Sequence, residues 1–433
     1  MKNYDTLKLT FFFVLIGFST ISNGQEVTIS DLFSGLEKNA VAHADELKVK
    51  QAKANQTIVT SQLYPAIDGF GKYDYSSIPS GLYPLPPNDL LPLVQNQNTP
   101  QPFSTNIFRV GAGISMPIYN QSLFTLAKQA KQMVISSQEQ QKINSIKNQS
   151  VLVANNANLN YIENLAFALE KKKQSLIKTK EIINAKVSNG RAAASLLYNI
   201  DNALDEIQIT LNDLALQKNS IQATVFSLTN IELQYAVKMD QISSLNTKNI
   251  GITKPLQEKI KADELALKAE KQILLPSIGL LGNYSFNFAK AYNNNKSINR
   301  EFVAASVVLK VPIFNNAQNA KIKKSKLIVE ESTNDLEKLT NEFHAQAKQL
   351  ENNLLIYENS IATHKNAIIN KEALRLIAIK KFELDQISIE DYLKYEDDLV
   401  LEKAKLYETE AQKWQTLTKL AVIYGTDLKT IVK

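Results

Sequence analysis

The chain has 433 residues, of which 44% are hydrophobic, and a formal net charge of +6. It contains no cysteine, which excludes structural disulfides, thiolate zinc sites and cysteine nucleophiles. Its 49 Lys and Arg residues are interspersed with 43 Asp and Glu residues, which indicates solvated helix faces rather than a nucleic-acid-binding surface.

The first 24 residues, 1–24, are predicted to form a secretory signal peptide. Lysines stand beside the start of an apolar run, Leu9–Phe18, and small residues follow it up to Gly24, where cleavage is expected. The run is too short to span a bilayer. The alternative is a buried N-terminal helix, but the order of charge, apolar run and small residues favours the signal peptide.

The distribution of proline and glycine predicts very long helices. Seven of the 12 prolines lie in the segment Pro79–Pro102. In contrast, the ranges 121–186, 191–250 and 313–424 contain neither proline nor glycine. Proline costs about 3 kcal/mol and glycine about 1 kcal/mol in a helix interior. A helix over 121–186 would be about 100 Å long, and its apolar residues recur every three or four positions, as in coiled-coil-like packing.

Four segments show the period-two alternation of β-strands, and each adjoins a proline. They are residues 66–75, 107–118, 277–288 and 302–313. One face of each is apolar, and the other is polar or small, with five charged residues predicted to face a lumen: Asp68, Lys72, Asp74, Arg109 and Lys310. This pattern suits strands that cross an outer membrane, although a soluble sandwich with one wet face is the alternative.

Four strands are too few to close a membrane barrel, because the smallest such barrels have about eight. Open strand edges cannot face lipid, since their backbone groups would lack hydrogen-bond partners. If the strands cross a membrane, several copies of the chain must therefore share one sheet.

The chain also contains an internal repeat, with a first unit at 25–250 and a second at 251–433. The segment around Pro117 matches that around Pro312, and the segment around Lys186 matches that around Lys381. Both pairs are 195 residues apart, since 312−117 and 381−186 give the same number. The long helix between them therefore has the same length in both units. Each unit is expected to run helix, strand, loop, strand, long helix, tip and helix, with the tips near residues 190 and 385.

These features resemble the TolC family of outer-membrane factors over nearly the whole mature chain. A helix runs into a strand through Leu-x-Pro at Leu63-Tyr64-Pro65 and Leu274-Leu275-Pro276. The second copy follows Lys254-Pro255-Leu256, also typical of the family. At the second tip, Ile389-Glu390-Asp391-Tyr392-Leu393 is similar to the family's Asp-x-Leu helix.

The resemblance implies a mainly α fold with a membrane β-barrel: long coiled-coil-like hairpins and four strands per subunit. A homotrimer would form a twelve-stranded barrel in the outer membrane and an α-barrel across the periplasm. The implied function is the passive exit duct of a tripartite efflux or type I secretion system, without catalysis, cofactor or metal. The implied partners are a periplasmic adaptor protein, an inner-membrane RND or ABC pump and outer-membrane lipid, with no nucleic acid.

The resemblance also suggests roles for the tips. Gly190 matches the turn of the family tip, and the adaptor-contact residues would be Asn189, Gly190, Arg191, Asp385 and Gln386. Asp391 matches an acidic position that lines the closed aperture. Departures are Asp385 in place of glycine, Lys394 in place of a second aperture acid and Ile387 in place of a gating arginine, so the gate is built differently here. The alternative for these charges is a solvated helix end.

Other functional classes find less support in the sequence. The histidines His43, His344 and His364 do not pair at metal-ligand spacing, and no nucleophile elbow or P-loop is present. The competing class is a periplasmic coiled-coil structural or adaptor protein that never enters the membrane. Two equal copies of a strand pair on long helices disfavour it. The predicted lumen residues mix both signs of charge and indicate no preference for a cargo.

Overall fold

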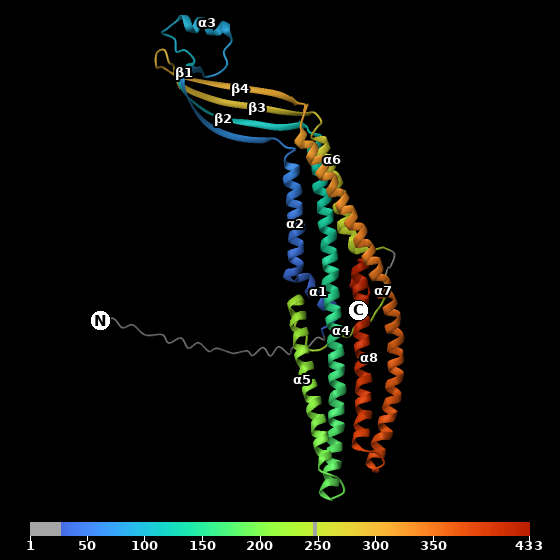
Figure 1. Cartoon of the computed structure of the whole chain (residues 1–433). Helices are drawn as coiled ribbons and strands as arrows, with labels where there is room; N and C mark the ends of the chain where they lie inside the picture. The colour runs from blue at the N-terminus through green and yellow to red at the C-terminus, as the bar shows by residue number, and fades with distance from the viewer. Residues whose placement is uncertain (1–26, 246–248) are drawn as a thin grey trace, which may run out of the picture.

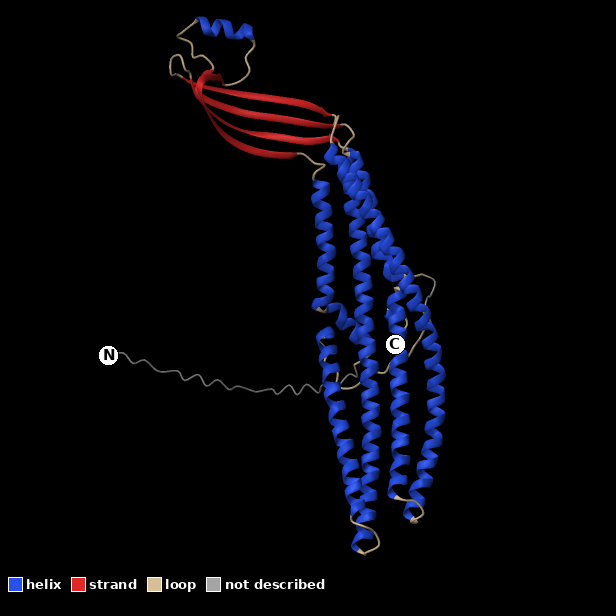
Figure 2. Ribbon diagram, viewed as in Figure 1, coloured by secondary structure: helices blue, strands red, loops and turns tan. Residues whose placement is uncertain are grey.

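The computed structural model of the chain describes residues 27–245 and 249–433. They form a long array of helices with a curved sheet at one end, which leans away from the helical axis (Figures 1 and 2). The predicted signal peptide, residues 1–24, lies outside the described residues.

The elements follow one another in the order that the repeat predicts. Their bounds are α1 Ile29–Lys38, α2 Ala40–Ser61, β1 Ala66–Gly81, α3 Pro87–Gln95, β2 Phe103–Tyr119, α4 Gln121–Ser188, α5 Ser195–Thr229, η1 Gly251–Thr253, α6 Lys254–Gln272, β3 Ser277–Lys290, β4 Ser297–Lys310, α7 Asn316–Glu383, α8 Ile389–Tyr424 and η2 Leu428–Thr430.

The repeat extends to helix length and capping. Helices α4 and α7 each have 68 residues. The Asn120 side chain accepts a hydrogen bond from the Leu123 amide (3.2 Å), and the Asn315 side chain accepts one from the Gln318 amide (3.1 Å). These N-caps satisfy amides that the first helical turn leaves without a partner. The predicted pair of equal long helices is therefore confirmed.

The helices form one curved layer in which α4 is central. Helix α4 packs against α2 near the sheet and α5 near the tips, and on its other side against α6 and α8. Helix α7 packs against α6 and α8. The layer therefore begins at α2 and α5 and ends at α7. Its buried core is divided into a cluster at mid-height, which includes Leu32, Leu152 and Leu417, and a cluster toward the tips, which includes Leu176 and Ile200.

The sheet repeats the order of the helices. It is antiparallel with the order β1-β2-β3-β4. The strands continue, in that order, the neighbouring helices α2, α4, α6 and α7. Strand β1 follows α2, and β4 precedes α7. One side of the molecule thus ends in β1, α2 and α5, and the other side ends in β4 and α7.

All four strands differ from the sequence prediction at one end or both: β2 already begins at Phe103, and β3 continues to Lys290. Strand β1 continues to Gly81, and β4 occupies 297–310 rather than 302–313. Pro312 has no amide hydrogen to donate to a ladder, so pairing ends at Lys310, opposite Ser277. At its other end β4 begins earlier because only residues 291–296 separate it from β3.

Helices long and apolar enough to cross a membrane are not found among the residues that the structure describes.

Gly251, at the start of the second repeat, lies in close contact with the end of α8 in the same repeat. A Cβ atom at this position would lie 2.4 Å from the Tyr424 carbonyl oxygen and 2.7 Å from its carbonyl carbon. We expect Gly251→Ala to destabilise the protein by about 1–3 kcal/mol, the usual cost of overpacking. Thermal unfolding of the detergent-solubilised protein measures this change. Gly71→Ala is the control, because nothing lies within 4 Å of its Cβ position. Equal melting temperatures for the two variants would contradict the prediction.

Candidate functional site

The strand register separates the sheet into an apolar and a polar face. Residues opposite one another on neighbouring strands point to the same side of a sheet. The apolar face carries residues from all four strands, among them Tyr73, Phe108, Val110, Tyr284, Phe286, Val303 and Val307. The five residues that were predicted to face a lumen all lie on the opposite, polar face: Asp68, Lys72, Asp74, Arg109 and Lys310.

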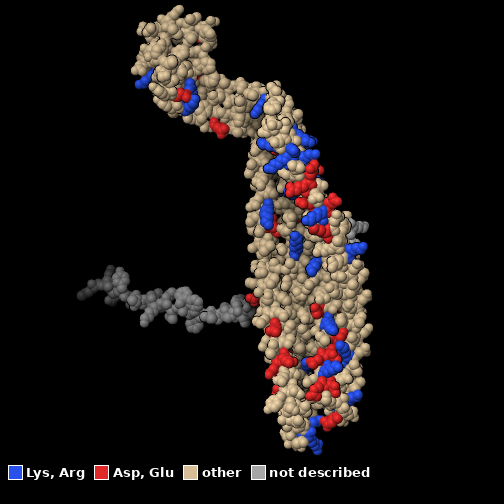
Figure 3. All heavy atoms as spheres, in the orientation of Figure 1, with Lys and Arg blue, Asp and Glu red and all other residues tan. Residues whose placement is uncertain are grey.

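Three of these five residues form an ionic cluster near the outer end of the sheet, the end away from the helices. Asp74 makes ion pairs with Arg109 and with the Lys72 ammonium (2.8 Å). The Arg109 guanidinium also donates to the Gly81 carbonyl (3.3 Å). Asp68 and Lys310 lie toward the helices and belong to no ion pair within the described part of the chain. The side of the molecule seen in Figure 3 carries few charged side chains on the sheet and many on the helices.

The structure adds Arg300 to the polar face, a residue that sequence reasoning missed. Arg300 lies opposite Asn287, which in turn lies opposite Arg109. The predicted strand begins at residue 302, and Glu301, on the apolar face, interrupts the alternation before it. The antiparallel pairing of Ser277 with Lys310, followed forward along β3 and backward along β4, places Arg300 opposite Asn287.

The proline-rich loop between β1 and β2 is fastened to the outer end of the polar face. Leu82 is buried with Ile107 and Ile298, two residues of that face, and with Ala291. The Asn293 side chain of the short β3–β4 loop donates to the carbonyls of Gln97 and Thr99 (3.0 Å each) and accepts from the Gln101 amide (3.1 Å). The longer external loop of the first repeat is thus held by the loop of the second.

Both helical tips have the same left-handed turn. Gly190 has φ +70°, and Asp385, 195 positions later, has φ +59°. The Arg191 amide donates to the Lys186 carbonyl and the Gln386 amide to the Lys381 carbonyl, each at 2.8 Å. Glycine suits this conformation, and aspartate tolerates it better than most residues.

All five residues expected to contact an adaptor are exposed at these tips, at 189–191 and 385–386. An ion pair between Lys186 and Asp385 joins the two tips. The Lys186 ammonium also lies 5.4 Å from the centre of the Phe382 ring. Each chain therefore presents two linked tips.

Asp391 is exposed in the first turn of α8. Its amide donates to the Ser388 hydroxyl, which donates in turn to the Asp391 carboxylate, both at 3.1 Å. This local contact caps the helix, and a carboxylate there also interacts favourably with the helix dipole. Lys394 is exposed, and Ile387 packs against the cluster near the tips.

Just above the tips, a buried polar network joins α4, α7 and α8. The Tyr392 hydroxyl bonds to the Ser175 hydroxyl (2.8 Å) and donates to Glu396 (2.7 Å). Glu396 is 2% exposed, accepts a bond from Ser175 (2.8 Å), and lies 3.4 Å from Arg375. Burial raises the pKa of Tyr392 to about 12, so its hydroxyl stays protonated at neutral pH.

A second ionic group lies farther up the same helices. Glu402 of α8 accepts from the Lys371 ammonium (2.8 Å), and its other oxygen lies 2.7 Å from His364 Nδ1. The hydrogen bond from Lys371, followed by that from His364, lowers the pKa of Glu402 below its ordinary value of 4.5.

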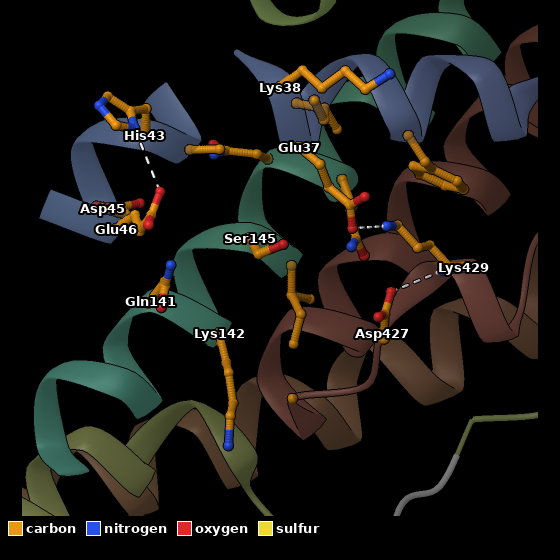
Figure 4. Close-up of a pocket in the computed structure, with 17 residues that line it drawn as sticks. Glu37, Lys38, His43, Asp45, Glu46, Gln141, Lys142, Ser145, Asp427 and Lys429 are labelled. Atoms are coloured by element: carbon orange, nitrogen blue, oxygen red, sulfur yellow. Dashed lines mark hydrogen bonds and ion pairs between the residues drawn. The ribbon is translucent and has the colours of Figure 1, made fainter. Parts of the chain in front are cut away.

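An open groove of about 780 Å³ lies at mid-height, where α1, α2 and α4 meet the C-terminal segment (Figure 4). An ion pair between Glu37 and Lys429 crosses it, and His43 turns toward Glu46 (3.4 Å). No group of three or more potential metal ligands occurs within residues 27–245 and 249–433. The groove therefore presents paired charges beside the edge helix α2.

Tyr392→Phe removes the hydroxyl that links Ser175 to Glu396, and we expect it to destabilise the protein by about 1–2 kcal/mol. The measurement is the melting temperature in detergent. Tyr395→Phe is the matched control, because its ring is 36% exposed and its hydroxyl has no hydrogen bond within the described residues. A melting temperature no lower than that of this control would show that the hydroxyl contributes nothing.

The lowered pKa of Glu402 predicts a pH-dependent contribution to stability. A depressed carboxyl pKa stabilises the folded state above the unfolded-state value near 4.5, and this stabilisation is lost as pH falls through the folded-state pKa. The melting temperature of Glu402→Gln should therefore lie furthest below wild type at pH 7 and approach it at pH 3. Glu337→Gln, an exposed residue of α7, is the control. A constant difference between Glu402→Gln and wild type at both pH values would contradict this linkage.

Comparison with known proteins supports the architecture. No family model and no curated protein sequence matches the chain. Solved structures do: CusC has a TM-score of 0.73 at 13% identity, with 92% of each chain covered. The Campylobacter jejuni CmeC outer-membrane channel scores 0.71 at 16% identity, covering 92% of this chain and 85% of that one. The open-state Neisseria gonorrhoeae MtrE outer-membrane channel scores 0.74 at 12% identity, covering 93% and 90%. The chain therefore has the fold of the TolC-type outer-membrane channels, as the Leu-x-Pro motifs and the repeat predicted.

Proposed function

We propose that the chain is a subunit of an outer-membrane channel and that three copies form a passive exit duct across the outer membrane and the periplasm. The observation that carries the proposal is the sheet with one apolar and one polar face, continuous with a helical layer that is open at both sides. In a closed assembly the apolar face of the sheet meets lipid and the polar face lines the passage. The duct itself performs no chemistry.

The edge helix α7 leaves many apolar side chains exposed, which favours assembly of several copies. Helix α4 buries 19 of its residues, whereas α7, of the same length, buries five. Leu355, Ile369 and Leu376 of α7 are 62%, 65% and 56% exposed, and they recur at multiples of seven positions. This spacing places them on one stripe of the helix, as in the seam of a coiled coil.

A matching stripe lies on the other edge. Ile209 and Leu216 of α5 are seven positions apart and 61% and 67% exposed. Ile209 lies 14 residues from the start of α5, and Ile369 lies 14 residues from the end of α7, so the two stand at similar heights above the tips. The α7 stripe of one copy can therefore pack against the α5 stripe of the next, while β4 pairs with the neighbouring β1. Three copies close a sheet of twelve strands.

The remaining parts of the proposal rest on the family resemblance. The predicted signal peptide directs export, and the exposed tips at 189–191 and 385–386 dock on a periplasmic adaptor. The adaptor links the duct to an inner-membrane pump of the RND or ABC type, and Asp391 contributes to the periplasmic aperture. Purification of the tagged protein from cross-linked cells would test these contacts, because the tips would cross-link to an adaptor.

The assembly predicts that a charge in either stripe weakens the trimer. Ile369→Glu and Ile209→Glu each place three carboxylates in apolar contacts between copies, which is costly without a partner. We expect a shift from the mass of three chains to that of one, measured by light scattering in detergent. Leu91→Glu in α3, an exposed apolar residue away from both edges, should leave the trimer intact. A wild-type protein with the mass of one chain would overturn the proposed assembly.

Conductance in planar bilayers tests the function itself. The purified mature protein should form pores of one unit size and remain with membranes after alkaline washing. If Asp391 lines the aperture, Asp391→Ala should make the pore less selective for cations. Pores with unchanged selectivity would still support a channel but would show that Asp391 does not line its aperture. Protein that is soluble without detergent and forms no pore would favour the alternative of a periplasmic structural or adaptor protein.

A further inference from the structure

The polar face of the sheet carries a row of basic side chains across all four strands. The register places Lys72 of β1 opposite Arg109 of β2, Arg109 opposite Asn287 of β3, and Asn287 opposite Arg300 of β4. Three of these four residues are cationic, and all four share one face. We call Lys72, Arg109, Asn287 and Arg300 the basic row.

The basic row is only partly neutralised. Asp74 pairs with both Lys72 and Arg109. The Arg300 guanidinium donates to the Asn299 carbonyl (3.0 Å), and no carboxylate of the described chain lies within ion-pair distance of it. Three cations against one carboxylate leave two positive charges per chain, and six in three copies.

The charges are distributed unequally along the polar face. Near the helices this face carries Asp68 and Lys310, whose charges cancel. The excess of positive charge is therefore confined to the outer half of the face. Lys290 and Glu301 also lie near the outer end, but the register places them on the apolar face.

The surroundings of the row strengthen its field. The neighbouring row toward the outer end consists of Asp74, Ile107, Ala289 and Ile298, and Leu82 of the proline-rich loop is buried against its isoleucines. Asn287 is 1% exposed, and its Oδ1 atom has no hydrogen-bond partner within the described residues. Charges beside apolar, dehydrated surface interact more strongly than charges in bulk water. The Lys72 side chain, although paired with Asp74, is 62% exposed, and Arg300 is exposed as well, so a solute can reach both.

We propose that the basic row is an anion filter at the outer end of the duct, which favours solutes that carry carboxylate or phosphate groups. The inference rests on the proposed channel function and adds the charge class of the solute. Guanidinium groups bind both kinds of anion through paired hydrogen bonds, and rings of cationic side chains confer anion selectivity on pores. Arg300 stands on the edge strand, so closure of the sheet brings it beside the next copy's β1 and continues the row around the barrel.

The test is the Cl⁻/K⁺ permeability ratio, obtained from the reversal potential of the trimer in planar bilayers under a KCl gradient. Wild type should prefer chloride. Arg300→Gln removes one cation per chain and should lower the ratio about fivefold, the factor that corresponds to ~1 kcal/mol for a unit charge near 4 Å in water. Lys290→Gln is the matched control, since it removes a lysine at the same end of the sheet but on the apolar face.

Block by citrate gives a second readout. Citrate added to the side of the outer loops should reduce chloride current through wild type and Lys290→Gln at lower concentrations than through Arg300→Gln. Equal permeability ratios and equal citrate block in wild type and Arg300→Gln would overturn the filter while leaving the channel intact. Absence of any pore in wild type would instead refute the proposed function.

Discussion

Everything in this structure depends on the unpaired edges of one layer. A strand edge exposes backbone donors and acceptors, and an edge helix exposes whatever apolar side chains it cannot bury within its own chain. Here both kinds of edge lie on the same two sides, because the strands continue the neighbouring helices in order. One mode of contact between copies can therefore pair the strand edges and bury the apolar side chains of the edge helices together. The sparse burial of α7 is the helical counterpart of the free edge of β4.

Two local features of the sequence produce the layer: one lengthens the helices, and the other ends them. Long stretches without proline or glycine propagate helices, since each added residue gains a hydrogen bond. Proline at 65 and 276 then ends a helix where a strand must begin, because the residue before proline favours extended backbone. The two changes from helix to strand, and the two from strand back to helix, thus lie at one end of the helical array, which keeps the sheet and the helices as separate zones.

Much of the architecture could be predicted because it follows from patterns of neighbouring residues and from the internal repeat of the sequence. The equal lengths of α4 and α7 followed from the 195-residue offset, and the left-handed turn at Asp385 followed from its alignment with Gly190. Arg300 was missed because the alternation of side chains within one strand does not show where that strand begins. Its pairing with Asn287 on the neighbouring strand places it on the polar face. The network of Tyr392 and Glu396 was missed for a related reason: their spacing of four residues along α8 does not reveal that Ser175 of α4 and Arg375 of α7 complete it.

The matched lengths of the two long helices restrict how this protein can change. An insertion of one residue in α4 alone would displace the first tip by about 1.5 Å and rotate every later side chain by about 100° relative to its neighbours. The contacts of α4 with α5 and α8 would then lose their register, as would the ion pair between Lys186 and Asp385. Length can therefore vary only as a coordinated change of whole heptads in α4, α5, α7 and α8. The equal lengths of α4 and α7 thus keep the two tips close enough for the ion pair between Lys186 and Asp385.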